Sequence, residues 1–194
     1  IETSGIPDNT DVYYSFGDNE DTSTVHVFRH GLKVTNGTTT FIAYGDMGTQ
    51  GDNDRNSTHE ILAHIDDVDF VLHVGDISYA RGNAKKWDSW FDEIEPISTK
   101  VPYHVCMGNH EYDWPTQHYK PWDWSFHKDS GGECGLPYNK RFLMPGPPLQ
   151  TKGDYLTGST NVYHSRNVGT VHFVLISSEH DSSKESEQYE WLAK

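Results

Sequence analysis

Basic side chains are scarce in this chain of 194 residues, in which 15 Lys and Arg stand against 29 Asp and Glu and leave a formal net charge of −14. Nucleic acids bind to surfaces that are rich in Lys and Arg, so this balance argues against a nucleic acid as a bound scaffold. It does not exclude a small phosphorylated substrate, because bound metal ions can reverse the local electrostatic field.

Long apolar runs and cysteines are also rare. No stretch of 18 apolar residues occurs, which predicts that no helix in these residues spans a membrane. Cys106 and Cys134 allow one disulfide or none, and Cys106 falls in an apolar stretch where a free thiol also packs well. If the bridge forms, it should stabilise the fold by roughly 3–4 kcal/mol. The chain begins at Ile1 without an initiator methionine, so we expect a processed or partial chain.

The sequence contains one pattern three times. An apolar stretch ends in glycine, and a residue with a side-chain oxygen follows, in residues 41–46, 68–76 and 102–109. The apolar stretches indicate buried strands of a parallel sheet, and the segments between them have helical periodicity. Right-handed crossovers bring the carboxyl ends of such strands to one edge of the sheet, where ligands bind. Asp46, Asp76, Asn109 and the adjacent His110 should therefore converge in one crevice.

These motifs also resemble those of a known family. They are Gly45-Asp46-Met47-Gly48, Gly75-Asp76-Ile77-Ser78-Tyr79 and Gly108-Asn109-His110-Glu111. They resemble the first three metal motifs of the metallophosphoesterases, and in particular of the purple acid phosphatases, which are marked by a tyrosine at the position of Tyr79. Most other metallophosphoesterases have a histidine where this chain has Gly48. Ser130–Gly135, Ser178–Asp181 and Gln188–Leu192 extend the resemblance to the large plant-type enzymes, especially the nucleotide pyrophosphatase/phosphodiesterase-like group.

The resemblance implies an α/β fold, in which a parallel-rich β-sheet with flanking helices forms the first half of a metallophosphoesterase βαβ sandwich. Residues 41–194 are the expected N-terminal half of that catalytic domain. Two β-rich runs between residues 11 and 28 predict a hairpin with one buried face. The resemblance implies that residues 1–34 are the C-terminal part of a fibronectin-like β domain, including its last strands, and that residues 35–40 are the linker.

Local signals predict the connecting elements. Ser57 and Glu60 form a capping box that should begin a helix after a polar loop. A second helix is expected over residues 84–94, with Pro96 as its stop and a core-facing stripe made of Trp87, Trp90, Phe91 and Ile94. Residues 112–160 lack periodicity and follow the third motif directly, so this long segment should form part of the wall of the site. Its aromatic side chains should mainly pack on the sheet, although stacking on a substrate base stays open. Residues 161–165 and 170–176 predict a hairpin.

The ligand assignment follows from phosphate-ester hydrolysis, which needs a nucleophile at moderate pH and cations that absorb charge on the phosphoryl oxygens. Asp76 is expected to bridge two ions because its strand should be central. Asp46 and Tyr79 would complete the shell of Fe(III), which is acidic enough to keep a phenolate ionised although a free phenol titrates near 10. Asn109 suits a divalent partner, which is zinc, manganese or Fe(II). His110 is the expected catalytic residue, holding a phosphoryl oxygen or protonating the leaving alkoxide.

The remaining histidines contribute less to this assignment. His73 and His172 alternate with apolar residues in predicted strands and are expected to be satisfied core residues. His180 follows the last strand and could face the crevice, although the resemblance gives no ligand at that position. The resemblance instead implies three histidine ligands from motifs downstream of residue 194.

The predicted function is that of a metal-dependent acid phosphatase, which hydrolyses phosphate esters by attack of a metal-bound hydroxide at a dinuclear Fe(III)–M(II) centre. Two alternatives stay open: a phosphodiesterase or nucleotide pyrophosphatase that uses the same site, and a non-catalytic secreted metal-binding or storage protein of the same fold. The expected partners are a small phosphorylated substrate and the remaining C-terminal polypeptide with its histidine ligands, without which residues 1–194 should be inactive. A homodimer stays open. Sequons at Asn36 and Asn56 fit a glycoprotein that is secreted or resides in the secretory pathway or vacuole.

Overall fold

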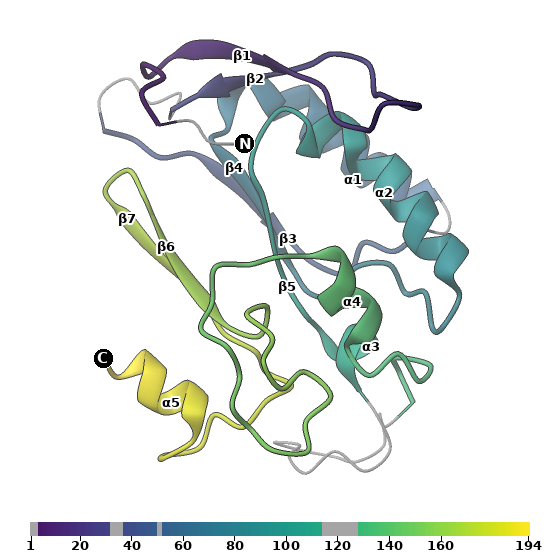
Figure 1. Cartoon of the computed structure of the whole chain (residues 1–194), viewed down its shortest axis with the longest axis vertical. Coiled ribbons are helices and arrows are strands. Elements are labelled where there is room, and N and C mark those ends of the chain that lie inside the picture. Colours follow the sequence, from purple (N-terminus) through teal and green to yellow (C-terminus); the bar gives the residue numbers. More distant parts are fainter. Residues whose placement is uncertain (1–3, 32–36, 50–51, 114–127) are drawn as a thin grey trace.

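The structure is a computed structural model that describes residues 4–31, 37–49, 52–113 and 128–194. A β-sheet at its centre is flanked by helices and by a β-hairpin, and a second hairpin lies at the N-terminal end (Figure 1). In chain order, the strands and α-helices are β1 (Thr10–Tyr14), β2 (His26–His30), β3 (Phe41–Tyr44), α1 (Asp52–His64), β4 (Phe70–Val74), α2 (Ala84–Ser98), β5 (Tyr103–Cys106), α3 (Asn109–Tyr112), α4 (Leu136–Arg141), β6 (His164–Val168), β7 (Val171–Leu175) and α5 (Glu187–Leu192). Among the described residues, no helix combines the length and the apolar character needed to cross a membrane.

The central sheet confirms the predicted βαβ arrangement. Its strands are parallel and lie in the order β3-β4-β5, so that β4 has a partner on both sides. Every residue of β4 except Val74 is buried, which explains why its sequence is nearly continuous in apolar residues instead of alternating. The carboxyl ends of all three strands therefore meet at the same edge of the sheet.

The two faces of β4 pack against different layers. Val71 joins a buried cluster with Ile61 of α1 and Ile97 of α2, so both helices cover this face. Phe70 and Leu72 point to the opposite face, where they pack against Val168 and Leu175 of the β6–β7 hairpin. This alternation places the sheet between a helical layer and a β-layer.

Helix α1 begins at Asp52, so the prediction that a polar loop continues to a capping box at Ser57 was wrong. As a consequence, the sequon residue Asn56 lies in a helix instead of a connecting loop. Capping signals and propensities are weak guides to the first turn, because polar residues cost little in an exposed helix and tertiary packing decides its length.

Helix α2 continues through Pro96 to Ser98, although Pro96 was expected to stop it. The proline removes one backbone donor from the helix, but the extra turn buries Ile97 completely. The backbone N–H of Thr99 then donates to the carbonyl of Glu95 at 3.1 Å and closes the turn. Burial of one large side chain therefore outweighs the lost hydrogen bond. The predicted core-facing stripe is confirmed, with Phe91 partly buried and three side chains buried: Trp87, Trp90 and Ile94.

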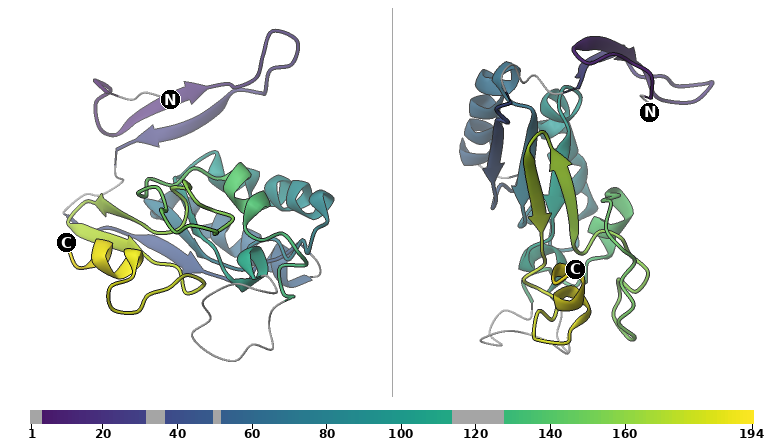
Figure 2. Two further views of the ribbon diagram at one scale, coloured as in Figure 1. Left: turned by 60° about the horizontal axis from the view of Figure 1, so that its bottom comes forward. Right: turned by 90° about the vertical axis from the view of Figure 1, so that its left-hand side faces the viewer.

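Both predicted hairpins are present and antiparallel. Along β1 and β2 the side chains alternate between half-buried and exposed, so the face that was predicted to be buried is only half covered. Figure 2 shows the β1–β2 hairpin apart from the layers of the central sheet. The Tyr14 hydroxyl contacts the end of α2 by donating to the Thr99 carbonyl at 3.2 Å. The assignment of residues 1–34 to a fibronectin-like domain stays a prediction.

The segment that follows the third motif lies partly outside the described residues, and the same is true of the sequon residue Asn36. From residue 128 onward it contains α4 and irregular backbone, in agreement with the predicted loss of periodicity. The described aromatic residue Tyr138 is completely buried in the core cluster, which supports a packing role. The other aromatic residues expected to pack or stack there lie outside the described part: Trp114, Tyr119, Trp122, Trp124 and Phe126.

Candidate metal centre

Two sharp turns beyond β3 and β4 begin the site. Asp46, Asp76 and Tyr79 have φ angles of 57°, 49° and 49°, a left-handed conformation that costs free energy for residues other than glycine. The turns are held side by side, because the N–H of Asp46 donates to the Gly75 carbonyl at 3.2 Å and the N–H of Gly48 donates to the Ile77 carbonyl at 2.8 Å. The parallel pairing of β3 with β4 thus continues into the turns and brings their side chains together.

Glycine precedes each motif residue because these turns approach one another closely. Gly75 has φ 89°, and a Cβ there would lie 2.9 Å from the backbone of Gly108. A Cβ at Gly108 would in turn overlap the Asp76 carboxylate. A larger residue at either position would therefore push the β4 and β5 turns apart.

Oxygen atoms from the first two motifs converge on one point. The Tyr79 hydroxyl lies 2.8 Å from Asp46 Oδ1 and 3.2 Å from Asp76 Oδ2, so it can donate to either carboxylate. Asp76 Oδ1 accepts the backbone N–H of His110 at 3.1 Å, which connects this group to the third motif. Asp76 lies between the two sides of the site.

The electrostatics of this group fit a cation. Burial raises the pKa of Asp76, and the negative charge of Asp46 raises it further. Burial and both neighbouring carboxylates also hold the pKa of Tyr79 well above its ordinary value. The raised pKa values of Asp76 and Tyr79 mean that these two groups ionise more readily when a positive charge lies among them, and hard oxygen donors are suited to such an ion. The residues present therefore fit a metal ion.

The third motif contributes Asn109 and His110 at the start of α3. The Asn109 amide nitrogen donates to Asp129 Oδ2 at 2.8 Å, which leaves the amide oxygen as the atom suited to a cation. The Nδ1 atom of His110 lies 3.0 Å from the Asp129 carbonyl oxygen, and its Nε2 atom lies 4.0 Å from Asp76 Oδ2. Asp129 belongs to the segment after the third motif, so the described part of this segment contacts two of the predicted site residues.

Glu111 fastens the β4 turn to the β5 turn, a role that the sequence did not reveal. Its side chain is 1 % exposed and accepts three backbone N–H groups. Oε2 accepts from Asp76 and Gly108, each at 2.9 Å, and Oε1 accepts from Ile77 at 2.8 Å. Burial raises the pKa of this carboxyl to about 8, although the three hydrogen bonds oppose the increase.

Glu133 plays a similar role for the loop that carries Tyr79, and it explains the motif Ser130–Gly135. Its Oε1 atom accepts the N–H of Gly82 at 2.9 Å and the indole N–H of Trp87 at 3.2 Å. The loop after Tyr79 is thereby fixed to α2. These contacts join residues that are far apart in sequence, so no local pattern could predict them.

A cavity of about 660 Å³ opens beside the site. Asp46, Asp76 and Asn109 lie on its lining together with the segment from Phe173 to Glu179. A set of apolar side chains on the same lining is exposed, and we call it the apolar strip: Val74 (53 % exposed), Val174 (41 %) and Ile176 (48 %).

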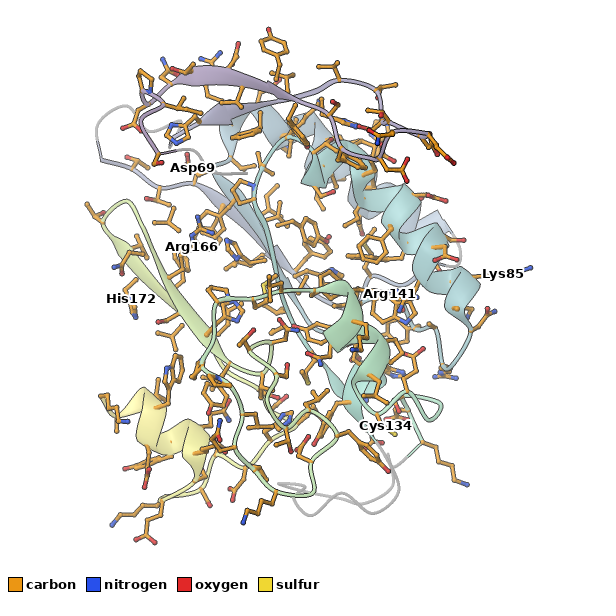
Figure 3. All side chains as sticks on the ribbon, in the orientation of Figure 1. Asp69, Lys85, Cys134, Arg141, Arg166 and His172 are labelled. Carbon is orange, nitrogen blue, oxygen red and sulfur yellow. The ribbon has the colours of Figure 1, made fainter. Side chains whose placement is uncertain are left out.

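Three histidines outside the third motif, all in the described part of the chain, do not join this group. His73 is completely buried, and burial lowers its pKa to about 3. It lies in the core as predicted, but only Nδ1 has a hydrogen-bond partner, the Tyr103 hydroxyl at 3.0 Å, whereas Nε2 has none among the described residues. His172 is exposed and lies on the outer side of β7, so the same prediction for it was wrong (Figure 3). The apolar alternation around His172 marks a half-covered hairpin, in which one face has no layer above it. His180 is buried against Tyr112 and Asp154 and is not among the residues that line the cavity described above.

Two further expectations concern clusters and cysteines. The described residues contain no group of three or more His, Cys, Asp or Glu side chains that could hold a metal ion. The predicted donors do not form such a group because only two of them, Asp46 and Asp76, are carboxylates, whereas Tyr79 is a phenol and Asn109 an amide. Cys106 and Cys134 are both free thiols, which settles the open choice against a bridge.

Comparison with known proteins identifies the family. The family model of the calcineurin-like phosphoesterases matches residues 39–194, which is most of the chain. The chain belongs to this family. The part of the chain that matches the family model thus begins immediately before β3 and includes all three motifs, whereas the β1–β2 hairpin precedes it.

Individual calcineurin-like phosphoesterases agree with the resemblance to purple acid phosphatases. The chain is 44% identical to a protein named probable inactive purple acid phosphatase 9 from Arabidopsis thaliana, over 93% of this chain and 30% of the relative. It is 33% identical to a nucleotide pyrophosphatase/phosphodiesterase from Hordeum vulgare, over 78% of this chain and 40% of the relative. A solved purple acid phosphatase from yellow lupin seeds superposes with a TM-score of 0.69 and 30% identity, over 88% of this chain and 30% of that one. The expected fold is confirmed, and the chain spans between 30% and 40% of the length of these relatives.

Proposed function

We propose that this protein is a metal-dependent phosphatase in which residues 41–194 carry the oxygen donors of a dinuclear centre. Asp46, Tyr79 and Asp76 would hold Fe(III), and Asp76 and Asn109 would hold a divalent zinc, manganese or iron ion. The convergence of the Tyr79 hydroxyl with two carboxylate oxygens, at 2.8 and 3.2 Å, is the observation that carries this proposal.

The choice of Fe(III) rests on Tyr79. Burial and two nearby carboxylates keep this phenol protonated in the absence of a cation. A strongly Lewis-acidic ion is therefore needed to make it a phenolate ligand, and a trivalent ion meets this requirement better than a divalent one. Asn109 offers a neutral oxygen and adds no charge, which suits the divalent site.

When bound, two such ions would lower the pKa of a water molecule and neutralise charge on the phosphoryl oxygens. Within the chain itself, His110 has the position of a proton donor. Its Nδ1–H is directed to the Asp129 carbonyl, so Nε2 is the atom left to face the crevice beside Asp76. We propose that His110 acts with a proton on both ring nitrogens, so that Nδ1–H stays on the Asp129 carbonyl while Nε2–H holds a phosphoryl oxygen or passes its proton to the leaving alkoxide.

The predicted donors among the described residues are too few for two ions. Asp46, Tyr79, Asn109 and a bridging Asp76 give five bonds when Asp76 is counted at both ions, whereas such ions take about four or more donors each. We propose that histidines from polypeptide outside residues 1–194 complete the shells and that this polypeptide covers the apolar strip. The greater length of the relatives and the exposure of the apolar strip support this proposal. Glycosylation and a secretory-pathway location also stay proposals.

The test is hydrolysis of p-nitrophenyl phosphate by the full-length protein at acid pH. We expect turnover, and we expect His110→Ala to lower kcat by roughly 10²–10⁴ while its metal content stays at the wild-type level. His59→Ala, on the exposed side of α1, serves as a matched control and should keep full activity. An unchanged kcat in His110→Ala would remove His110 from the mechanism.

Two other functions remain candidates, because the names of two relatives indicate them. The relative from Hordeum vulgare suggests nucleotide pyrophosphatase or phosphodiesterase action, which a nucleoside diphosphate and bis-p-nitrophenyl phosphate would reveal in the same assay. The relative named probable inactive purple acid phosphatase 9 suggests a metal-binding protein without catalysis. A full-length protein that contains metal and hydrolyses none of these esters would favour this last function.

A further inference from the structure

We propose that Asp129 is a positioning residue that fixes both Asn109 and His110, and that its loss selectively weakens the divalent site. This inference rests on the proposed function, because it gives Asp129 a role toward a metal ion that the donor set implies. The observation behind it is a two-point contact, in which the side chain of Asp129 binds one residue of the motif and its backbone carbonyl binds the next.

The contact with Asn109 decides which end of the amide faces the crevice. An amide side chain has an oxygen and an NH₂ group of almost equal size, so sterics alone do not distinguish its two orientations. Asp129 Oδ2 accepts the N–H of Asn109 at 2.8 Å, and the reversed orientation would place the amide oxygen against a carboxylate oxygen. The same bond polarises the amide, which makes its oxygen a better donor to a cation.

The contact with His110 decides which ring nitrogen is available. The Asp129 carbonyl can only accept a hydrogen bond, so it selects the imidazole with a proton on Nδ1. The ring is then held at 4.3 Å from the ring of Tyr79, with Nε2 on the side of Asp76. Asp129 thereby sets the orientation of the predicted catalytic residue without contacting the reacting atoms.

Asp129 is itself held in place by the end of α3. Its backbone N–H lies 3.4 Å from the carboxylate of Asp113, and the neighbouring Ser130 hydroxyl donates to the Asp113 carbonyl. Asp113 and Ser130 are both completely buried. Helix α3 therefore carries the two motif residues at its beginning and anchors Asp129 at its end, which keeps all three in one rigid unit.

The experiment is a zinc titration of the iron-loaded full-length protein by calorimetry, with the visible absorbance of the iron site recorded on the same samples. We expect Asp129→Ala to weaken zinc binding by roughly 10–100-fold, the usual effect of losing a partner of a metal ligand, while the absorbance band stays unchanged. Asp129→Asn retains an oxygen acceptor and should bind zinc within about threefold of the wild type. Lys128→Ala, at the exposed preceding residue, is the matched control.

The possible results separate the two proposals. Zinc affinity in Asp129→Ala within about twofold of the wild type overturns the positioning role, and so does an equal loss of zinc and of the iron band, which would indicate only a structural role. A wild-type protein that takes up none of zinc, manganese and Fe(II) in this titration overturns the proposed function, and this inference with it. If Asp129→Ala does not fold, Asn109→Asp alone and combined with Asp129→Asn replace it. Asn109→Asp alone places its carboxylate against that of Asp129, whereas the double variant restores an amide partner. The double variant should therefore bind zinc more tightly than the single variant, and equal or weaker binding contradicts the proposal.

Discussion

Replacing Asp76 by asparagine should remove both metal ions from the full-length protein, with a loss of affinity greater than the roughly 10–100-fold typical of a partner outside the ligand shell. Asp76 is the acidic side chain that touches both sides of the site, since Oδ2 meets the Tyr79 hydroxyl and Oδ1 meets the backbone of His110. Asparagine keeps the size but removes the negative charge and turns one oxygen into a donor. Elemental analysis of the purified variant measures the result.

His110→Ala is the matched control for this experiment, because it removes a neighbouring side chain without removing a proposed ligand. It should retain both metals. Equal metal loss in the two variants would make His110 a ligand and contradict the division of roles. Full metal retention in Asp76→Asn would show that Asp76 does not bridge the two ions.

Replacing Glu111 should lower the free energy of unfolding more than replacing any other residue at the site. Glu111→Ala leaves three buried backbone donors without an acceptor, and each such group costs about 1–3 kcal/mol, so we expect a loss of about 3 kcal/mol or more in the free energy of unfolding. Glu111→Gln keeps one acceptor oxygen but turns an NH₂ group toward a backbone N–H, which should cost about 1–3 kcal/mol.

Urea unfolding of the full-length protein, followed by tryptophan fluorescence, measures both effects. Glu60→Gln makes the same chemical change on the exposed side of α1 and should leave the midpoint unchanged. If Glu111→Gln unfolded within about 0.5 kcal/mol of the wild type, the three hydrogen bonds would not be holding the β4 and β5 turns together.

The convergence of the three motifs was predictable because it depends on topology. Parallel strands joined by right-handed crossovers place Asp46, Asp76 and Asn109 at one edge whatever the details of the packing. The central position of β4 followed from its nearly continuous apolar sequence. The resemblance to the purple acid phosphatases added Tyr79, whose proximity to both carboxylates no spacing rule would have required.

The residues that hold the motifs in place could not be predicted in the same way. Glu111, Asp129 and Glu133 act through hydrogen bonds to distant backbone or side-chain groups, such as the contact between Glu133 and Gly82 across 51 residues. A single sequence contains no signal for such pairs. Glu111 was visible as part of a motif, but its role appears only when three N–H groups are seen to point at it.

The wrong predictions about where α1 begins and where α2 ends had a different cause. Pro96 and the capping box at Ser57 are local signals, and neither marked an end of its helix. At Pro96 tertiary packing prevailed, as the buried Ile97 illustrates. His172 was misplaced because alternation in a strand shows that one face is covered without showing which. The hairpin face that carries His172 has no layer above it in the described part of the chain.

The most direct test of the account is the visible absorption spectrum of the oxidised full-length protein and of its Tyr79→Phe variant. If Tyr79 is a phenolate ligand of Fe(III), the wild type should show a charge-transfer band in the visible. Tyr79→Phe should lose this band while it keeps most of its iron, because Asp46 and Asp76 remain. An oxidised protein that contains iron and is colourless, or a variant that keeps the band, would contradict the proposed site.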